Sequence, residues 1–190
     1  MNREDFKKIE TQDEFVALLK KHDLFREDDV TFDDIEEDGM YTFTGNGFQL
    51  DAALLDSLEI SALLVEGDVT VESLSVNDIL PDFGVFCVSG HVHCKDFYCA
   101  TESTGVSIGG NLSVSHIFYA DCGNSVVQVN GDLTAKVLFV SQCLVEVRGD
   151  EKSEFDQSVS NSDLAALGLT TEEGEKAEKA IAAYFEALSP

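Results

Sequence analysis

Two histidines and a nearby cysteine are the residues of this sequence whose types and spacing best suit chemistry. His91 and His93 are separated by one residue, so on an extended strand both imidazoles point to the same face. Cys87 lies on the same expected outer face, and imidazole and thiolate are both ligands that zinc accepts. No fourth ligand stands at a recognised spacing, so an ordinary polar strand face is the alternative. We expect no metal and no cofactor.

The cysteines indicate reduced thiols. Cys122 and Cys143 are 21 residues apart and occupy the same position in successive repeats, which predicts a small apolar ladder or, alternatively, a redox switch. Cys94 and Cys99 are expected in the core. An odd total of five, without metal-site spacing, is typical of a reducing cytoplasm, so we expect a cytoplasmic protein.

Sequence signatures of common enzymes are absent. The chain contains no G-x-S-x-G elbow, no P-loop, no G-x-G-x-x-G turn and no H-E-x-x-H helix. We therefore expect a protein that is not an enzyme.

A repeat of about 20 residues must position all of these side chains. Patterns such as Val65-Glu-Gly-Asp-Val-Thr-Val71 recur around glycines that are 23, 20, 21 and 18 residues apart. Repeats of this length predict a solenoid, in which each unit buries its apolar face by stacking on the next. The aligned glycines are Gly67, Gly90, Gly110, Gly131 and Gly149.

Alternation around each glycine predicts strands with one buried face. Apolar residues two and four positions to either side of the glycine should point inward, and the glycine should mark a bend. The resulting fold is mainly β: a short right-handed parallel β-helix of about five coils. A leucine-rich-repeat-like solenoid is the alternative, because Val114-x-x-Ile117-x-Tyr119-x-x-Cys122 fits that frame.

The flanks of the repeats predict helices within one domain of residues 1–190. Residues 1–40 form an acidic N-terminal cap with a helix over 11–22, which Thr11 and Glu14 begin as a capping box. The β-solenoid covers 41–150, with a short edge strand at Val30 and Phe32 before it. In 151–190, a connector with a possible helical turn at 162–168 leads to a capping helix over 170–188.

An outward aromatic stripe is the strongest candidate for a binding site. Eight residues after each glycine, between two inward positions, the chain carries Ser75, Tyr98, Phe118 and Phe139. Aromatic side chains on an outer face are covered by something. The cover is either a protein partner or the C-terminal helix, whose apolar face carries Ile181, Tyr184 and Phe185.

The charge of the chain favours a basic protein partner. With 37 acidic against 12 basic residues, the formal net charge is −25, which repels nucleic acid and anionic membranes. High solubility alone is the alternative explanation. No apolar run approaches the ~18 residues of a membrane-spanning helix.

The motifs Val65-Glu-Gly-Asp-Val-Thr-Val71 and Val129-Asn-Gly-Asp-Leu-Thr-Ala135 resemble the repeat of bactofilins, over roughly residues 60–150. That resemblance implies a β-helix that assembles head to tail into filaments without nucleotide. The profile of a small, acidic chain also looks like the immunity proteins of bacterial toxin systems. Two functions follow: a protein–protein interaction module, such as an inhibitor of a basic partner, or a self-assembling structural protein. For the first we expect a monomer or a small homo-oligomer.

Overall fold

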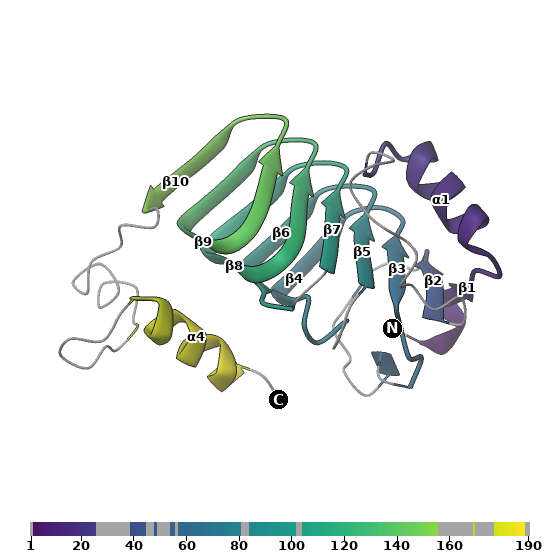
Figure 1. The fold of residues 1–190 in the computed structure, drawn as a ribbon, viewed down its shortest axis with the longest axis horizontal. Coiled ribbons are helices and arrows are strands. Elements are labelled where there is room, and N and C mark those ends of the chain that lie inside the picture. The colour runs from purple at the N-terminus through teal and green to yellow at the C-terminus, as the bar shows by residue number, and fades with distance from the viewer. Residues whose placement is uncertain are drawn as a thin grey trace.

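The computed structural model shows a β-solenoid of about five turns (Figure 1), which confirms the expected fold class. Its strands run parallel from β2 to β10, and both sides of each coil are strands, unlike the alternating strand and helix of a leucine-rich repeat. The structure describes residues 2–25, 39–44, 48, 54–55, 57–80, 84–101, 104–155, 169 and 177–188, except for the side chains of a few of them.

Two parallel ladders form the sides of the solenoid. The first ladder contains β2 (Met40–Phe43), β3 (Ala62–Val65), β5 (Gly84–Val88), β7 (Thr104–Ile108) and the later parts of β8 (Leu112–Val129) and β9 (Leu133–Val147). The second contains β4 (Val69–Ser75), β6 (Val92–Cys99), the earlier parts of β8 and β9, and β10 (Glu151–Phe155).

Stacked apolar columns fill the interior, as alternation predicts. Val69, Val92, Leu112 and Leu133 pair in sequence across four coils and are all fully buried. Cys94 and Cys99 also lie in this core, as expected. Burial and the nearby Asp96 charge raise the pKa of the Cys94 thiol to about 12.

Close backbone contact explains the glycine at the last four corners, whereas Gly67 has a positive φ of 111° and no atom within 4 Å of its Cβ position. Gly110 N–H donates to the Gly90 carbonyl at 2.9 Å, and Gly131 N–H donates to the Gly110 carbonyl at 3.0 Å. A Cβ atom on Gly110 would lie 2.9 Å from the carbonyl carbon of Gly90 and 2.6 Å from His91 Nδ1. Such distances leave no room for a side chain at these bends.

A single antiparallel strand closes the N-terminal end. β1 (Phe6–Lys8) follows a 3-10 turn at Arg3–Asp5 and pairs antiparallel with β2. Phe6 packs against Phe43, whose ring also contacts Phe48 at 5.3 Å. These three phenylalanines cover the first coil.

The N-terminal helix covers a side of the solenoid, whereas β1 closes its end. α1 (Gln12–Lys21) begins at Thr11, whose hydroxyl accepts a hydrogen bond from Glu14 N–H at 3.3 Å, as expected. Its Phe15 and Leu19 are buried against Leu64 and Cys87 on the outer face of β3 and β5.

Residues at the end of α1 and just after it contact coils that lie far along the sequence. His22 and Lys21 contact Glu66 in the first complete coil. The Asp23 carboxylate lies 2.7 Å from the Arg148 guanidinium, and its carbonyl accepts a hydrogen bond from Asn130. The expected strand at Val30 and Phe32 and the turn at 162–168 lie outside the described residues.

The C-terminal helix also packs on a side of the solenoid. α4 (Ala177–Leu188) lies beside the second ladder, below it in Figure 1. It ends where the sequence predicts, and the expected start at 170 lies outside the described residues. The expected closure of the open end by this helix is wrong for the part of the chain described here, because α4 contacts the outer faces of β6, β8 and β9. An amphipathic helix is stabilised wherever it meets an apolar surface.

Candidate functional site

The aromatic stripe exists, but one of its expected members lies in the core. Phe118 is fully buried and stacks on Phe97 with ring centroids 4.8 Å apart. Tyr119 takes the outward place, so the outer column is Ser75, Tyr98, Tyr119 and Phe139. The expectations that Phe118 faces outward and that Ile117 and Tyr119 face inward are therefore wrong.

A one-residue bulge causes this reversal. Between Cys94 and Phe97 in β6 there are two residues, whereas between Val114 and Phe118 in β8 there are three. One extra residue turns every later side chain of that strand segment to the opposite face. The strands regain register at Phe97 and Phe118, so Tyr98 pairs with Tyr119.

α4 covers most of this stripe. Tyr98, Tyr119 and Phe139 form a continuous stack, with centroids 5.4 Å and 5.2 Å apart. Phe185 of α4 stacks on Tyr98 at 4.5 Å, and the buried Ile181 completes the contact. Of the two covers considered for the stripe, the chain's own helix is therefore the one present.

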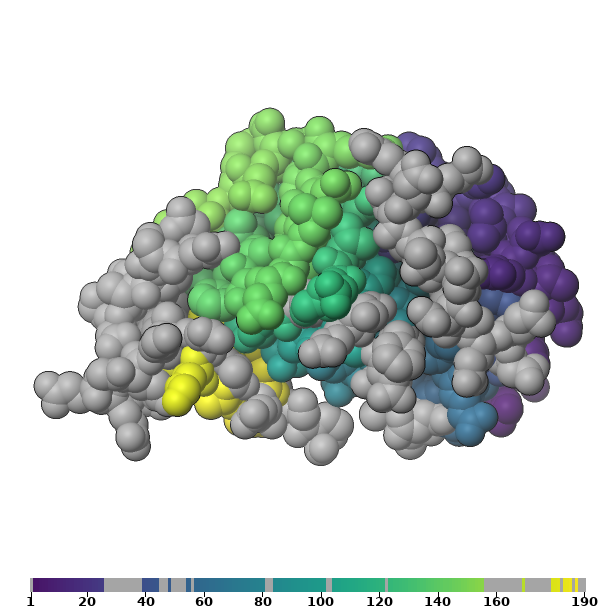
Figure 2. Space-filling view, viewed as in Figure 1, coloured from purple at the N-terminus to yellow at the C-terminus, as the bar shows by residue number. Residues whose placement is uncertain are grey.

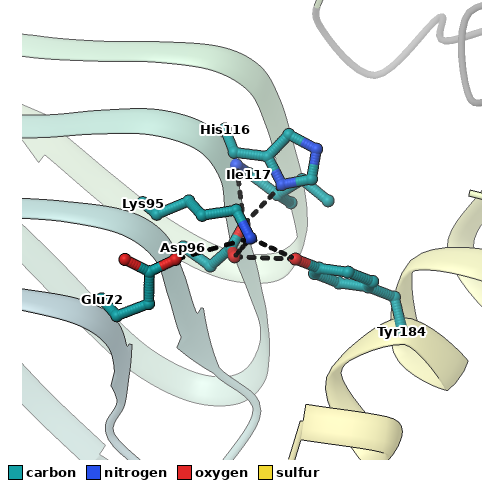
Figure 3. Close-up of polar contacts among 6 residues, drawn as sticks. All are labelled: Glu72, Lys95, Asp96, His116, Ile117 and Tyr184. Atoms are coloured by element: carbon teal, nitrogen blue, oxygen red, sulfur yellow. Dashed lines mark hydrogen bonds and ion pairs between the residues drawn. The ribbon is translucent and has the colours of Figure 1, made fainter. Parts of the chain in front are cut away.

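A buried carboxylate anchors α4 at the edge of the aromatic contact (Figure 3). Asp96 is 1% exposed, and it accepts a hydrogen bond from the Tyr184 hydroxyl at 2.8 Å. Asp96 Oδ1 also lies 2.7 Å from His116 Nδ1 and accepts a bond from Ile117 N–H at 3.3 Å. Lys95 Nζ stands 3.6 Å from its other oxygen. A buried carboxylate is tolerated only when such partners replace water.

Two members of this cluster, Tyr184 and Lys95, have a raised pKa. Burial and the hydrogen bond to Asp96 raise the pKa of Tyr184 above its ordinary value. The hydrogen bond to Tyr184 and the charge of Asp96 raise the pKa of Lys95. The hydrogen bond between Tyr184 and Asp96 joins α4 to β6 and holds the helix in position over the aromatic stripe.

Loss of the Tyr184 proton is expected to release α4 at alkaline pH. A raised folded-state pKa stabilises the docked helix below the unfolded value of 10.0, and this stabilisation disappears as pH rises through the folded value. Tyr184→Phe should lower the free energy of unfolding by about 1–3 kcal/mol at pH 7, since Asp96 loses a donor. The variant should also reduce the loss of stability above pH 10. Urea unfolding between pH 7 and pH 11.5 measures both effects, with Tyr41→Phe as the control; an unchanged alkaline profile in Tyr184→Phe would contradict the assignment.

Sequence reasoning missed Asp96, His116 and Tyr119 as parts of this site. The outward orientation of Tyr119 was missed because the bulge in β8 leaves no recognisable pattern in the sequence of the strand. A signal did exist for Asp96, because it stands on the outer face two residues before Tyr98, where the neighbouring coils carry Ser73 and Ile117. A carboxylate there needs a donor, and Tyr184 on the apolar face of α4 supplies one.

The two histidines have no metal site with Cys87. Cys87 is fully buried beneath α1, and burial raises the pKa of its thiol. Cys87 faces outward as expected, but α1 covers it, so its thiol is not available beside the histidines. The rings of His91 and His93 are 6.4 Å apart, and the described residues contain no group of three or more potential metal ligands.

His91 belongs to a ladder of side chains that accept backbone hydrogen bonds at the corner. Asp68 Oδ1 accepts from His91 N–H at 2.7 Å, and His91 Nδ1 accepts from Asn111 N–H at 2.9 Å. Asn111 and Asp132 continue the pattern into the next two coils at 3.0 Å and 2.9 Å. His91 therefore carries its proton on Nε2, and Nδ1 is committed to the backbone.

Asparagine is expected to replace His91 with little effect. Asn111 already makes the same bond one coil later, so His91→Asn should change the free energy of unfolding by less than about 0.5 kcal/mol. His91→Ala should cost about 1 kcal/mol, because Asn111 N–H loses its acceptor. Thermal unfolding of both variants compares them. If His91→Asn and His91→Ala unfold with equal free energies, the hydrogen bond from Asn111 N–H does not explain why a histidine stands at position 91.

The predicted cysteine ladder is also displaced. β8 and β9 lose register between Asp121 and Ser125, and Cys143 pairs with Ser125. Cys143 Sγ lies 3.7 Å from the Ser125 carbonyl. The expected pairing of Cys143 with Cys122 is therefore wrong, and the Cys122 side chain lies outside the described residues.

No family model, curated protein or solved structure matches this chain. None of the helices described is long and apolar enough to span a membrane.

Proposed function

We propose that this protein is a non-enzymatic interaction module that binds a basic protein, as an immunity or inhibitor protein would. The observation that carries the proposal is the formal net charge of −25 on a chain of 190 residues. Such a charge accelerates encounter with a cationic protein and suppresses encounter with nucleic acid.

Internal ion pairs already occupy several of the few basic side chains. Lys21 pairs with Glu66 at 3.3 Å, Arg148 with Asp23 at 2.7 Å and Lys152 with Asp150 at 3.1 Å. Lys95 lies between Glu72 and Asp96. Because these cations are paired with acidic residues of the same molecule, they offer little attraction to an anionic partner. The excess of acidic residues remains available to attract a basic partner.

The aromatic stripe supports this proposal less than the charge does. Tyr98 and Tyr119 are in contact with Phe185, so a partner would first have to displace α4. Binding therefore takes place on other surfaces of the solenoid.

The partner is to be sought among the proteins encoded beside this one. Each neighbouring gene product should be purified and mixed with the protein, and complex formation followed by sedimentation velocity. We expect a basic neighbour to form a discrete complex whose association rate falls as salt rises beyond 0.1 M, where charges are screened over ~10 Å. If a partner binds with an association rate that does not depend on salt, the charge does not drive recognition.

A self-assembling structural role is the second candidate, and the last coil favours it. Val140, Val145 and Val147 point inward but are only partly buried. Head-to-tail stacking would need a parallel edge at the other end, where β1 pairs antiparallel and Phe6 covers the core. This closed end is why the interaction module ranks first. Salt-dependent filaments in sedimentation, in place of monomers or small oligomers, would reverse the ranking.

A further inference from the structure

We propose that the later part of β9, Gln142–Val147, is a docking edge for an extended basic segment of the partner. This inference rests on the proposed function and assigns its binding surface. The segment would add a strand to the first ladder, with apolar residues alternating with lysine or arginine.

The backbone of this edge is open on one side. Ser141–Val147 pairs with β8, whereas β10 continues only over the part of β9 from Leu133 to Val137. Arg148 N–H donates to the Val129 carbonyl in β8, so alternation directs the N–H groups of Val145 and Val147 to the opposite side. Among the described strands, none lies on that side. Addition of a strand to such an edge is a common mode of peptide recognition.

The side chains of this edge lack the cover that the same columns have in earlier coils. Val127 and Val129 are fully buried, whereas their neighbours Val145 and Val147 are half-buried. Leu144 is 58% exposed and is the most exposed large apolar residue of the described chain. Figure 2 shows the green atoms of the last coils on the molecular surface. An added strand with apolar residues beside Val145 and Val147 would complete the coil.

The charges around the edge favour a basic occupant. Glu146 is the one charged residue of the segment 142–147, and the chain as a whole carries a formal net charge of −25. The nearest base in the sequence, Arg148, is paired with Asp23 within the molecule. The Glu146 side chain points to the outer face of the edge strand. It would therefore lie beside the outward-pointing side chains of an added strand. The alternation of the strand therefore calls for apolar residues inward and cations outward.

A synthetic peptide of alternating lysine and valine provides the probe. We expect it to bind the full-length protein in isothermal titration calorimetry, and to slow hydrogen exchange at the Val145 and Val147 amides. N-methylation of every second peptide nitrogen removes strand pairing while keeping charge and apolar content, and it should abolish binding. The same peptide with glutamate in place of lysine should not bind.

Protein variants locate the site. Leu144 and Glu146 both face outward, so Leu144→Ser should weaken binding about tenfold through lost contact with the methylene stems of the outward lysines, and Glu146→Gln about threefold through lost attraction. The matched exposed controls on the second ladder, Thr134→Ser and Glu154→Gln, should bind as the unmodified protein does.

Three results would overturn the inference. The first is binding without protection of Val145 and Val147, which would place the basic partner elsewhere and leave the proposed function standing. The second is failure of the peptide to bind while a basic neighbouring protein does, with the same consequence. The third is a dimer of the protein that Leu144→Ser dissociates, which would show that a second copy occupies the edge.

Discussion

Replacing Phe118 with alanine is expected to lower the free energy of unfolding by about 3–5 kcal/mol, the cost of removing a large buried aromatic side chain. Phe118 is fully buried, and its ring lies nearly parallel to that of Phe97, 4.8 Å away. The substitution would leave a cavity in a middle coil. The coils on both sides would keep that coil from collapsing into the cavity. Urea denaturation at pH 7 measures the effect.

The contrast with Phe139 tests which face each ring occupies. Phe139 is half-buried on the outer face, so Phe139→Ala should cost distinctly less than Phe118→Ala. The Phe118 variant should also keep α4 docked, since that ring does not touch the helix contact. A loss below about 1 kcal/mol for Phe118→Ala would mean that the bulge in β8 is misplaced.

Removal of residues 171–190 is expected to lower the free energy of unfolding by about 3–6 kcal/mol and to cause association. The truncation removes the buried Ile181 and Phe185, each of which stabilises by about 1.5–3 kcal/mol. It also uncovers Tyr98 and Tyr119 and takes the Tyr184 hydroxyl from the Asp96 carboxylate. Exposed apolar surface of this kind favours self-association.

Sedimentation velocity over a range of concentrations, together with urea denaturation, measures both consequences. Lys179→Ala, at an exposed position of α4, is the control and should change stability by no more than about 0.5 kcal/mol. A truncated protein that stays monomeric and as stable as the full chain would show that α4 contributes nothing to covering the stripe.

The proposed docking edge and the covered stripe occupy different ladders of the solenoid. Leu144 belongs to the first ladder, and Tyr119 belongs to the second. A partner can therefore bind β9 while α4 remains docked. This separation lets the Leu144 and Tyr184 variants be interpreted independently, because residues without shared contacts have nearly additive effects.

The sequence by itself determined the repeating coil and its core. Glycine at each corner and apolar residues at alternate positions are local patterns, and both follow from the geometry of a single strand and bend. For this reason the stacked column through Val92 and Leu112, the helix that Thr11 begins and the end of α4 agree with expectation. The existence of an outward aromatic stripe was also predicted from the sequence, and two of its expected members, Tyr98 and Phe139, do face outward.

Only the tertiary structure decided which side chain fills each place at irregular points. One extra residue between Val114 and Phe118 exchanges Phe118 for Tyr119, and the strand pattern tolerates either register until the neighbouring coils fix it. Likewise, Cys87 is buried because α1 lies over it, and Asp96 is satisfied because Tyr184 arrives from a helix 88 residues away in sequence. These contacts join segments far apart in the chain, so the free energy of packing selects them, and local sequence does not encode them.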